Sequence, residues 1–157
     1  MSASEKTDKI QSLLAKEGID ANILVFSEST KTSQDAANQA RCLLGQIAKS
    51  IIFKTGDEPV LAIMSGPNRV STRKIEQLTG IKLEKADAQF VLDKTGFPIG
   101  GVPAFGHNAP IKFIFMDQDL VQYKTIWSAA GTPHAIFEIT PQNLARISRA
   151  RMADIKE

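Results

Sequence analysis

Residues Ala48–Met64, with the sequence AKSIIFKTGDEPVLAIM, decide the fold because they hold two apolar runs joined by a short polar turn. Ala48–Lys54 and Val60–Met64 are rich in Ile, Val and Leu, so both are predicted to be strands. The connection between them contains Gly56 and Pro59, which is typical of a β-hairpin loop. The sequence therefore indicates a sheet built around this antiparallel pair.

Outward from the hairpin, helical and strand patterns follow one another without strict alternation. Further strands are expected at Asn22–Phe26, Ile81–Leu83, Ile111–Met116 (as a central strand), Thr125–Ala130 and Ala135–Ile139. Helices are expected at Ser4–Lys16, from Thr32 or Ser33 to Leu43 or Leu44, at Thr72–Leu78, at Asp87–Lys94 and after the cap Thr140–Pro141. The tail Arg149–Glu157 is expected to be frayed or to continue the last helix. About seven strands and four or five helices predict one α+β (mixed α/β) domain over residues 1–157, with a mixed, curved β-sheet.

Composition narrows the class of protein. The chain has 157 residues, 43% of them hydrophobic and 23% charged, which is typical of a globular protein. It contains no apolar run of about 18 residues and no signal peptide, so we expect no membrane partner and a cytoplasmic location. The single cysteine, Cys42, excludes an internal disulfide and is expected in the core. With only two histidines, neither a metal site nor a cofactor is expected. A net charge of +2 permits an RNA partner without requiring one.

The segment Phe97–Pro110 (FPIGGVPAFGHNAP) is the least regular part of the chain. The adjacent glycines Gly100 and Gly101 would let backbone N–H groups approach a carbonyl oxygen or an oxyanion closely. A simple tight turn has the same composition, and His107 alone is more typical of a loop histidine than of a general base. The segment matches neither a dinucleotide-binding nor a phosphate-binding glycine motif.

Two more features are candidates for a binding site. Gly131–His134 (GTPH) joins two predicted strands and supplies a hydroxyl and an imidazole, although a surface β-turn explains it equally well. Lys49 shares one face of its strand with Ile47, Ile51 and Phe53, so it either lines a cleft or extends to solvent from an edge strand. Tyr123 and Trp127 are predicted to be packing groups.

Taken together, these stretches resemble the YbaK/EbsC family, which includes free-standing relatives of the editing domain of bacterial prolyl-tRNA synthetase. The resemblance runs from about Ile10 to Ile147. The stretches that carry it are Gly45–Phe53 (GQIAKSIIF), Arg69–Gly80, Thr95–Gly106 (TGFPIGGVPAFG) and Ala130–His134 continuing into Phe137–Ile139.

The resemblance implies an aminoacyl-tRNA deacylase that removes a small amino acid such as Ala, Cys, Ser or Thr from mischarged proline tRNA. It implies that the protein uses no metal and does not bind DNA. The implied partners are the acceptor end of an aminoacyl-tRNA and a prolyl-tRNA synthetase or other translation factor. Lys49 matches the lysine on which these deacylases rely, and Gly100 and Gly101 are expected to polarise the ester carbonyl. The remaining implied pocket residues are Val102, Phe105, Gly106, His107, Gly131, Thr132, Pro133 and His134.

One departure affects the substrate. Family members that act on cysteinyl-proline-tRNA carry a Lys-Arg-Gly type stretch and a nearby aspartate, where this chain has Thr132–Pro133–His134 and Ile136. The chain is therefore more similar to the other free-standing subgroups, for which alanine, serine, threonine or a non-protein amino acid are alternatives. A catalytically inert module that binds aminoacyl-tRNA or a synthetase, and a small-ligand-binding domain without an RNA partner, are the competing hypotheses.

Overall fold

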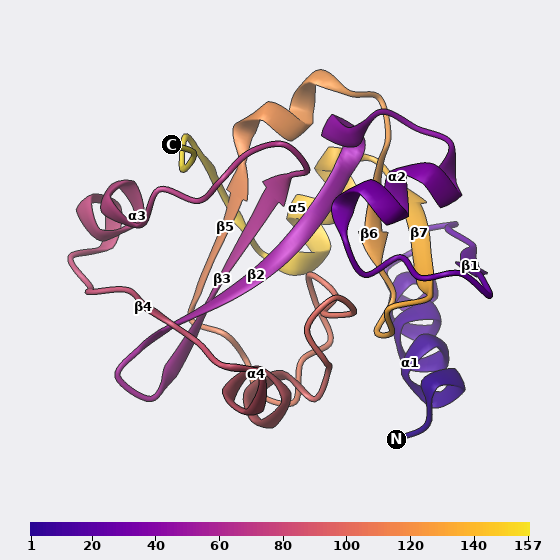
Figure 1. Cartoon of the computed structure of the whole chain (residues 1–157), viewed down its shortest axis with the longest axis horizontal. Coiled ribbons are helices and arrows are strands. Elements are labelled where there is room, and N and C mark those ends of the chain that lie inside the picture. Colours follow the sequence, from indigo (N-terminus) through magenta and orange to yellow (C-terminus); the bar gives the residue numbers. More distant parts are fainter.

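The computed structural model describes residues 1–157 and contains eight strands in one mixed sheet with five α-helices (Figure 1). The strands are β1 (Ile23–Val25), β2 (Ile47–Thr55), β3 (Glu58–Ser65), β4 (Glu84–Lys85), β5 (Phe113–Asp117), β6 (Ile126–Ala129), β7 (Ala135–Ile139) and β8 (Arg151–Ala153). The helices are α1 (Ala3–Lys16), α2 (Ser33–Ala40), α3 (Thr72–Thr79), α4 (Ala88–Thr95) and α5 (Pro141–Ser148), with short 3-10 helices η1 (Leu44–Gln46) and η2 (Gln118–Gln122). The mixed α/β class predicted from the sequence is confirmed. None of the helices is long and apolar enough to cross a membrane.

The sheet has the strand order β1-β7-β6-β2-β3-β5-β8, with β4 also paired to β2. As predicted, β2 and β3 form an antiparallel hairpin, in register from Ala48 opposite Ser65 to Thr55 opposite Glu58. The pairs β2–β6, β3–β5 and β5–β8 are parallel. The predicted central strand β5 is thus an interior strand, one position from the edge strand β8.

Three local predictions were wrong. Instead of Ile81–Leu83, the short strand of this region is β4, at Glu84–Lys85. Helix α2 ends at Ala40 because Arg41 adopts the left-handed conformation, with φ 55°, which stops helical hydrogen bonding. The tail forms β8 rather than more helix, since Ile155 is fully buried against the sheet and draws the chain to its edge.

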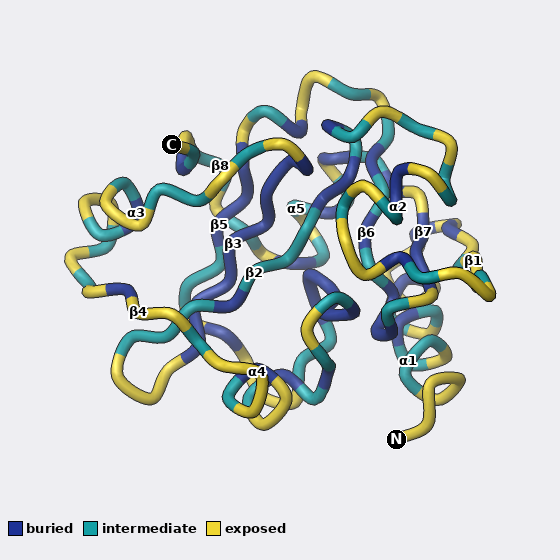
Figure 2. Tube along the Cα trace, in the orientation of Figure 1, coloured by how far each residue is buried: buried dark blue, intermediate teal, exposed yellow.

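Helices cover the two faces of the sheet unequally. Helices α1, α4 and α5 pack on one face through Ile10, Val91 and Leu144, which belong to the largest apolar cluster. On the other face, α3 covers one end through Ile75, and α2 covers the opposite end through Ala36. Figure 2 shows that β3 is buried along most of its length, whereas the middle of β2 is only partly covered. The space between α2 and α3 therefore exposes part of the face that carries Lys49.

One edge of β2 is interrupted. Along β3 the strand is paired from Ala48 to Thr55, but on its other edge only Ile47–Ala48 pair with β6 and only Phe53–Lys54 pair with β4. Residues 49–52 therefore have no strand partner on that edge, and strands β6 and β2 diverge there. A concavity opens at this divergence.

Candidate functional site

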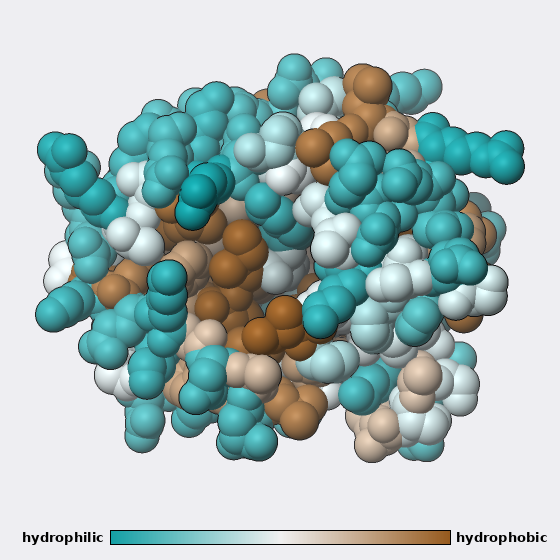
Figure 3. Space-filling model, viewed as in Figure 1, coloured by the Kyte–Doolittle hydropathy of each residue, from teal (hydrophilic) through white to brown (hydrophobic).

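A cavity of about 310 Å³ opens where β2 and β6 diverge. Its walls come from β2, from the ends of β6 and β7, from the start of α2 with the residues before it, and from the loop after α4. The lining residues are Thr30–Ser33, Ala36, Ile47–Ile51, Ile99, Gly100, Val102, Trp127–Ala129 and Ile136. Figure 3 shows apolar residues gathered in a hollow over the middle of β2, with hydrophilic residues around it. The lining of the cavity combines apolar side chains with Lys49 and several hydroxyl groups.

Lys49 lines this cavity from β2, and its ammonium group lies at the turn that follows β3. The side chain is half-buried, and its Nζ donates to the carbonyl oxygen of Gly66 at 2.9 Å. Burial lowers the pKa of Lys49, nearby Arg69 lowers it further, and Asp117 opposes the shift. Strand alternation predicted that this lysine either lines a cleft or extends to solvent, and in the structure it lines the cleft. One of its three N–H donors is used, so two are available to a ligand.

Three hydroxyl groups in the cavity wall have no hydrogen-bond partner within the protein. They are the side-chain oxygens of Thr30, Ser50 and Ser128. Thr30 and Ser128 are only 5% and 1% exposed. Because a buried hydroxyl without a partner costs free energy, three of them in one wall indicate that a polar ligand or water satisfies them.

The two glycines of the loop after α4 have different roles. The Gly101 N–H donates to the carbonyl oxygen of Pro98 at 3.0 Å, so this amide is used inside a turn. A Cβ on Gly101 would lie 2.6 Å from the carbonyl carbon of Thr132, so the loop is pressed against residues 131–134. Gly100 lines the cavity, and no hydrogen bond uses its N–H. Of the two amides expected to face a carbonyl, only that of Gly100 is free.

Residues Gly131–His134 lie behind the cavity wall and do not line it. The carbonyl oxygen of Pro133 accepts from the Thr30 N–H at 2.7 Å, and that of His134 accepts from Phe26 N–H at 2.8 Å. The His134 ring, which is exposed, contacts the carbonyl oxygen of Glu28 at 3.1 Å. This loop therefore holds the segment before α2, which supplies one wall of the cavity.

The other residues expected in the pocket have separate surroundings. Val102 lines the cavity and is buried. Phe105 lies in the core, with its ring edge-on to Phe137 at 6.0 Å between centroids. Gly106 packs against α1, and His107 Nε2 contacts the carbonyl oxygen of Pro103 at 2.8 Å. Burial lowers the pKa of His107, so its imidazole is a neutral packing group away from the cavity.

Several cavity residues were not predicted from the sequence. Trp127, predicted to be a packing group, lines the cavity and is half-buried. Ser128 could have been found, because a polar residue inside the apolar run of β6 is unusual. Thr30, Lys31 and the start of α2 carry no such signal, since their sequence is that of an ordinary polar loop. Cys42, expected in the core, is half-buried beyond the end of α2. No three His, Cys, Asp or Glu side chains lie close enough together to bind a metal ion.

Comparison with known proteins places this chain in a family. A model of the aminoacyl-tRNA editing domain matches residues 27–147. Because the match spans most of the chain, the protein belongs to the aminoacyl-tRNA editing domain family, as its resemblance to the YbaK-like proteins indicated.

Individual relatives support this assignment. YwhH of Bacillus subtilis (strain 168), an uncharacterized protein, is 30% identical over 134 residues, which are 83% of each chain. A proline–tRNA ligase of Thermoanaerobacter sp. (strain X514) is 26% identical over 136 residues, which are 84% of this chain and 23% of the ligase. The crystal structure of a candidate trans-editing enzyme for prolyl-tRNA synthetase is 37% identical and superposes with a TM-score of 0.91 over 99% of both chains.

Proposed function

We propose that this protein is a free-standing aminoacyl-tRNA deacylase that hydrolyses the ester of a mischarged tRNA. The observation that carries the proposal is a half-buried lysine beside three unpartnered hydroxyls in one small cavity. A volume of about 310 Å³ suits an aminoacyl group and part of a ribose, because it lies at the low end of the range for ligand pockets.

The proposed substrate is proline tRNA carrying a small amino acid such as Ala, Cys, Ser or Thr. The similarity to proline–tRNA ligases and to the candidate trans-editing structure supports this choice. A synthetase pocket built for proline rejects smaller side chains weakly, because each missing methylene changes binding by only about 1–3 kcal/mol. A second, smaller site that hydrolyses the wrong product supplies the missing discrimination.

The reaction requires little covalent chemistry from the protein. Water adds to the carbonyl carbon of the ester, the bond to the ribose oxygen breaks, and that oxygen takes up a proton. In the proposed geometry, the two free N–H donors of Lys49 and the free amide of Gly100 stabilise the developing oxyanion or orient the neighbouring phosphate. Thr30, Ser50 and Ser128 then accept hydrogen bonds from the α-ammonium group of the amino acid.

The partner in this proposal is the single-stranded acceptor end of the tRNA. Lys31 is exposed, and its side chain lies across Gly100 beside the cavity. Its ammonium group can meet a phosphate while the ester enters the cavity, and a broad basic surface is not needed for so short a contact.

The Lys49→Ala variant tests the proposal. Each purified protein is incubated with proline tRNA charged with alanine, cysteine, serine or threonine, and loss of the ester is measured above the spontaneous rate. We expect the wild type to deacylate at least one of these, and Lys49→Ala to be slower by about 10²–10³-fold. Lys54→Ala is the matched control, because Lys54 lies near the end of the same strand and its ammonium group lies over the Phe90 ring, away from the cavity.

Two outcomes would contradict the proposal. Full activity of Lys49→Ala with an unchanged fold would remove the lysine from the reaction. Binding of every charged tRNA by the wild type without hydrolysis of any would instead favour an inert binding module of the same fold.

A further inference from the structure

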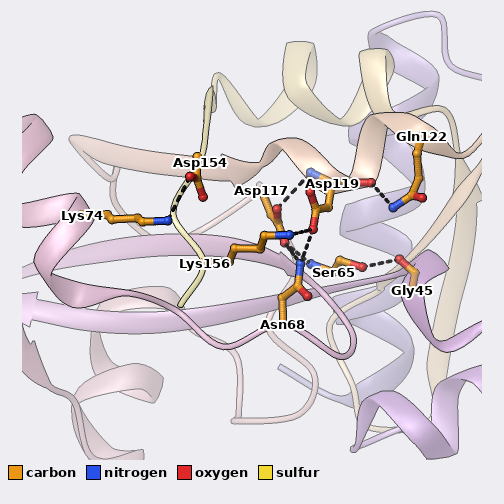
Figure 4. A network of polar contacts seen from close by, with 9 residues as sticks. All are labelled: Gly45, Ser65, Asn68, Lys74, Asp117, Asp119, Gln122, Asp154 and Lys156. Carbon is orange, nitrogen blue, oxygen red and sulfur yellow. Dashed lines mark hydrogen bonds and ion pairs between the residues drawn. The ribbon is translucent and has the colours of Figure 1, made fainter.

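A buried carboxylate lies behind Lys49, outside the cavity. Asp117 ends β5 and is 0% exposed. Its Oδ2 accepts from the Ser65 N–H at 3.1 Å and from Asn68 Nδ2 at 2.8 Å, while its Oδ1 accepts from the Asp119 N–H at 3.0 Å (Figure 4). A buried charge is costly unless its oxygens are hydrogen-bonded, so three N–H donors on one carboxylate indicate a site of defined geometry.

This carboxylate holds the turn that follows β3. Within the turn, the Asn68 N–H donates to the carbonyl oxygen of Ser65 at 2.9 Å. On the far side, Ser65 Oγ donates to the carbonyl oxygen of Gly45 at 2.6 Å. Gly66 is pressed against the backbone of Leu44 so closely that no Cβ would fit. The turn is therefore fixed from two sides, by β5 and by η1.

The fixed turn presents the acceptor that holds Lys49. The carbonyl oxygen of Gly66 accepts from Lys49 Nζ at 2.9 Å, which is the single hydrogen bond that the ammonium group makes within the protein. A small rotation of the turn would move this oxygen, and with it the ammonium group of Lys49.

Further hydrogen bonds lie between Asp117 and the solvent. Asn68 Nδ2 also donates to Asp119 Oδ2 at 2.8 Å, and that oxygen accepts from Lys156 Nζ at 2.6 Å. Lys74 and Asp154 form a separate exposed ion pair at 2.9 Å that does not touch Asp117 (Figure 4). The exposed pair therefore offers a control for changes that merely loosen this region.

We propose that Asp117 is a positioning residue for Lys49: it anchors the Ser65–Asn68 turn, whose Gly66 carbonyl oxygen sets the direction of the Lys49 ammonium group. The effect on catalysis rests on the proposed deacylase function, whereas the effect on the lysine itself does not. No contact between Asp117 and substrate is needed.

The charges around Lys49 give this role a second consequence. Arg69 follows the turn, Lys31 lies beside the cavity, and Asp117 is the acidic group that acts on the ammonium. Removing the charge of Asp117 leaves the effects of burial and of Arg69 unopposed, so the pKa of Lys49 falls further. A larger fraction of the lysine is then neutral at a given alkaline pH.

The experiment first measures the titration of the Lys49 side chain and then the deacylase activity of the protein. The ammonium group is titrated by NMR of protein labelled with ¹³C and ¹⁵N at the lysine side chains, with Lys49→Arg used to assign its signal. We expect Asp117→Asn to shift the Lys49 titration midpoint to lower pH and to reduce kcat by about 10²-fold, with KM little changed because the cavity wall is intact. The alkaline limb of the pH–kcat profile should move to lower pH by the same shift.

A second variant keeps the proposal falsifiable if Asp117→Asn fails to fold. Asn68 is half-buried, and Asn68→Ala removes one donor to Asp117 and the clamp on the turn. We expect a smaller loss of kcat in this variant, and none in the control Lys74→Ala. Folded Asp117→Asn with a wild-type Lys49 titration, or folded Asn68→Ala with wild-type kcat, would overturn the proposal. If no charged tRNA is hydrolysed by the wild type, the NMR titration still decides whether Asp117 acts on Lys49.

Discussion

At the scale of single residues, burial changes the chemistry of Lys49 and His107 in the same direction and with different consequences. Both side chains have a lowered pKa because their charged forms are poorly solvated. Lys49 retains an open side toward the cavity, so its ammonium group can bind a ligand. His107 is enclosed by its own loop and by Phe97, whose ring is edge-on to it at 6.5 Å, so its neutral form contributes to stability.

His107 predicts a pH dependence of stability. Its pKa in the folded chain is below the ordinary value of 6.5, so the unfolded chain binds this proton more readily. His107 therefore stabilises the fold above about pH 6.5, and that contribution is lost as the pH falls through the folded pKa, at no more than about 1.4 kcal/mol per pH unit. Urea unfolding at pH 7.5 and pH 5.5 measures the effect, which should shrink in His107→Gln. The exposed His134→Gln serves as control, and equal pH dependence in all three proteins would contradict the assignment.

At the scale of elements, the cavity depends on two loops that pack against each other. The loop after α4 carries Gly100 to the cavity, and the loop before β7 supports it from behind through Thr132. Only a residue without a Cβ lets the two backbones approach so closely, which explains the second of the paired glycines by packing rather than by chemistry.

Gly101→Ala tests this packing. The added methyl would lie 2.6 Å from the carbonyl carbon of Thr132, so both loops must move. We expect the free energy of unfolding to fall by about 1–3 kcal/mol and deacylation to decrease as well. Gly56→Ala, in the open β2–β3 turn at φ 58°, should keep full activity, because no atom lies near the added methyl group. Its free energy of unfolding should fall only by the cost of a left-handed backbone conformation at a residue with a Cβ. A Gly101→Ala protein with wild-type stability would show that the loops are not in close contact.

Elements with a strong local pattern were predictable, and elements formed by distant contacts were not. The β2–β3 hairpin followed from two apolar runs and a Gly–Pro turn, and the cap Thr140–Pro141 marked the start of α5. The short strands β4 and β8 carry no comparable pattern, because they exist only where the sheet offers them an edge. For the same reason Lys49 could be singled out from its strand, whereas Thr30 joins the site through a fold that brings distant segments together.

At the scale of the whole molecule, the net positive charge is small, but two of the lysines lie at the cavity. The net charge is only +2, yet Lys31 and Lys49 both lie at one cavity. Under the proposed function, electrostatic binding should therefore involve few phosphates.

The salt dependence of tRNA binding tests this view. Each phosphate contact on a single strand contributes about 0.7 to the slope of log K against log salt concentration. We expect Lys31→Ala to reduce the slope by about that amount, while Lys16→Ala, on the exposed surface of α1, leaves it unchanged. Filter-binding titrations across a range of salt concentrations would measure both slopes. Equal slopes for Lys31→Ala and the wild type would remove Lys31 from the RNA contact.

The parallel pairing of β2 with β6 also bears on how the chain reaches its native state. Ile47 lies opposite Trp127, and Ser71, which comes shortly after the turn that holds Lys49, donates its N–H to the carbonyl oxygen of Ile155. Contacts between such distant segments form slowly, because a long loop must close before any of them is made. The hairpin can therefore form early, whereas the cavity exists only once the last strands have docked. During synthesis, a chain that has emerged only as far as β5 would contain Lys49 and yet have no site in which to use it.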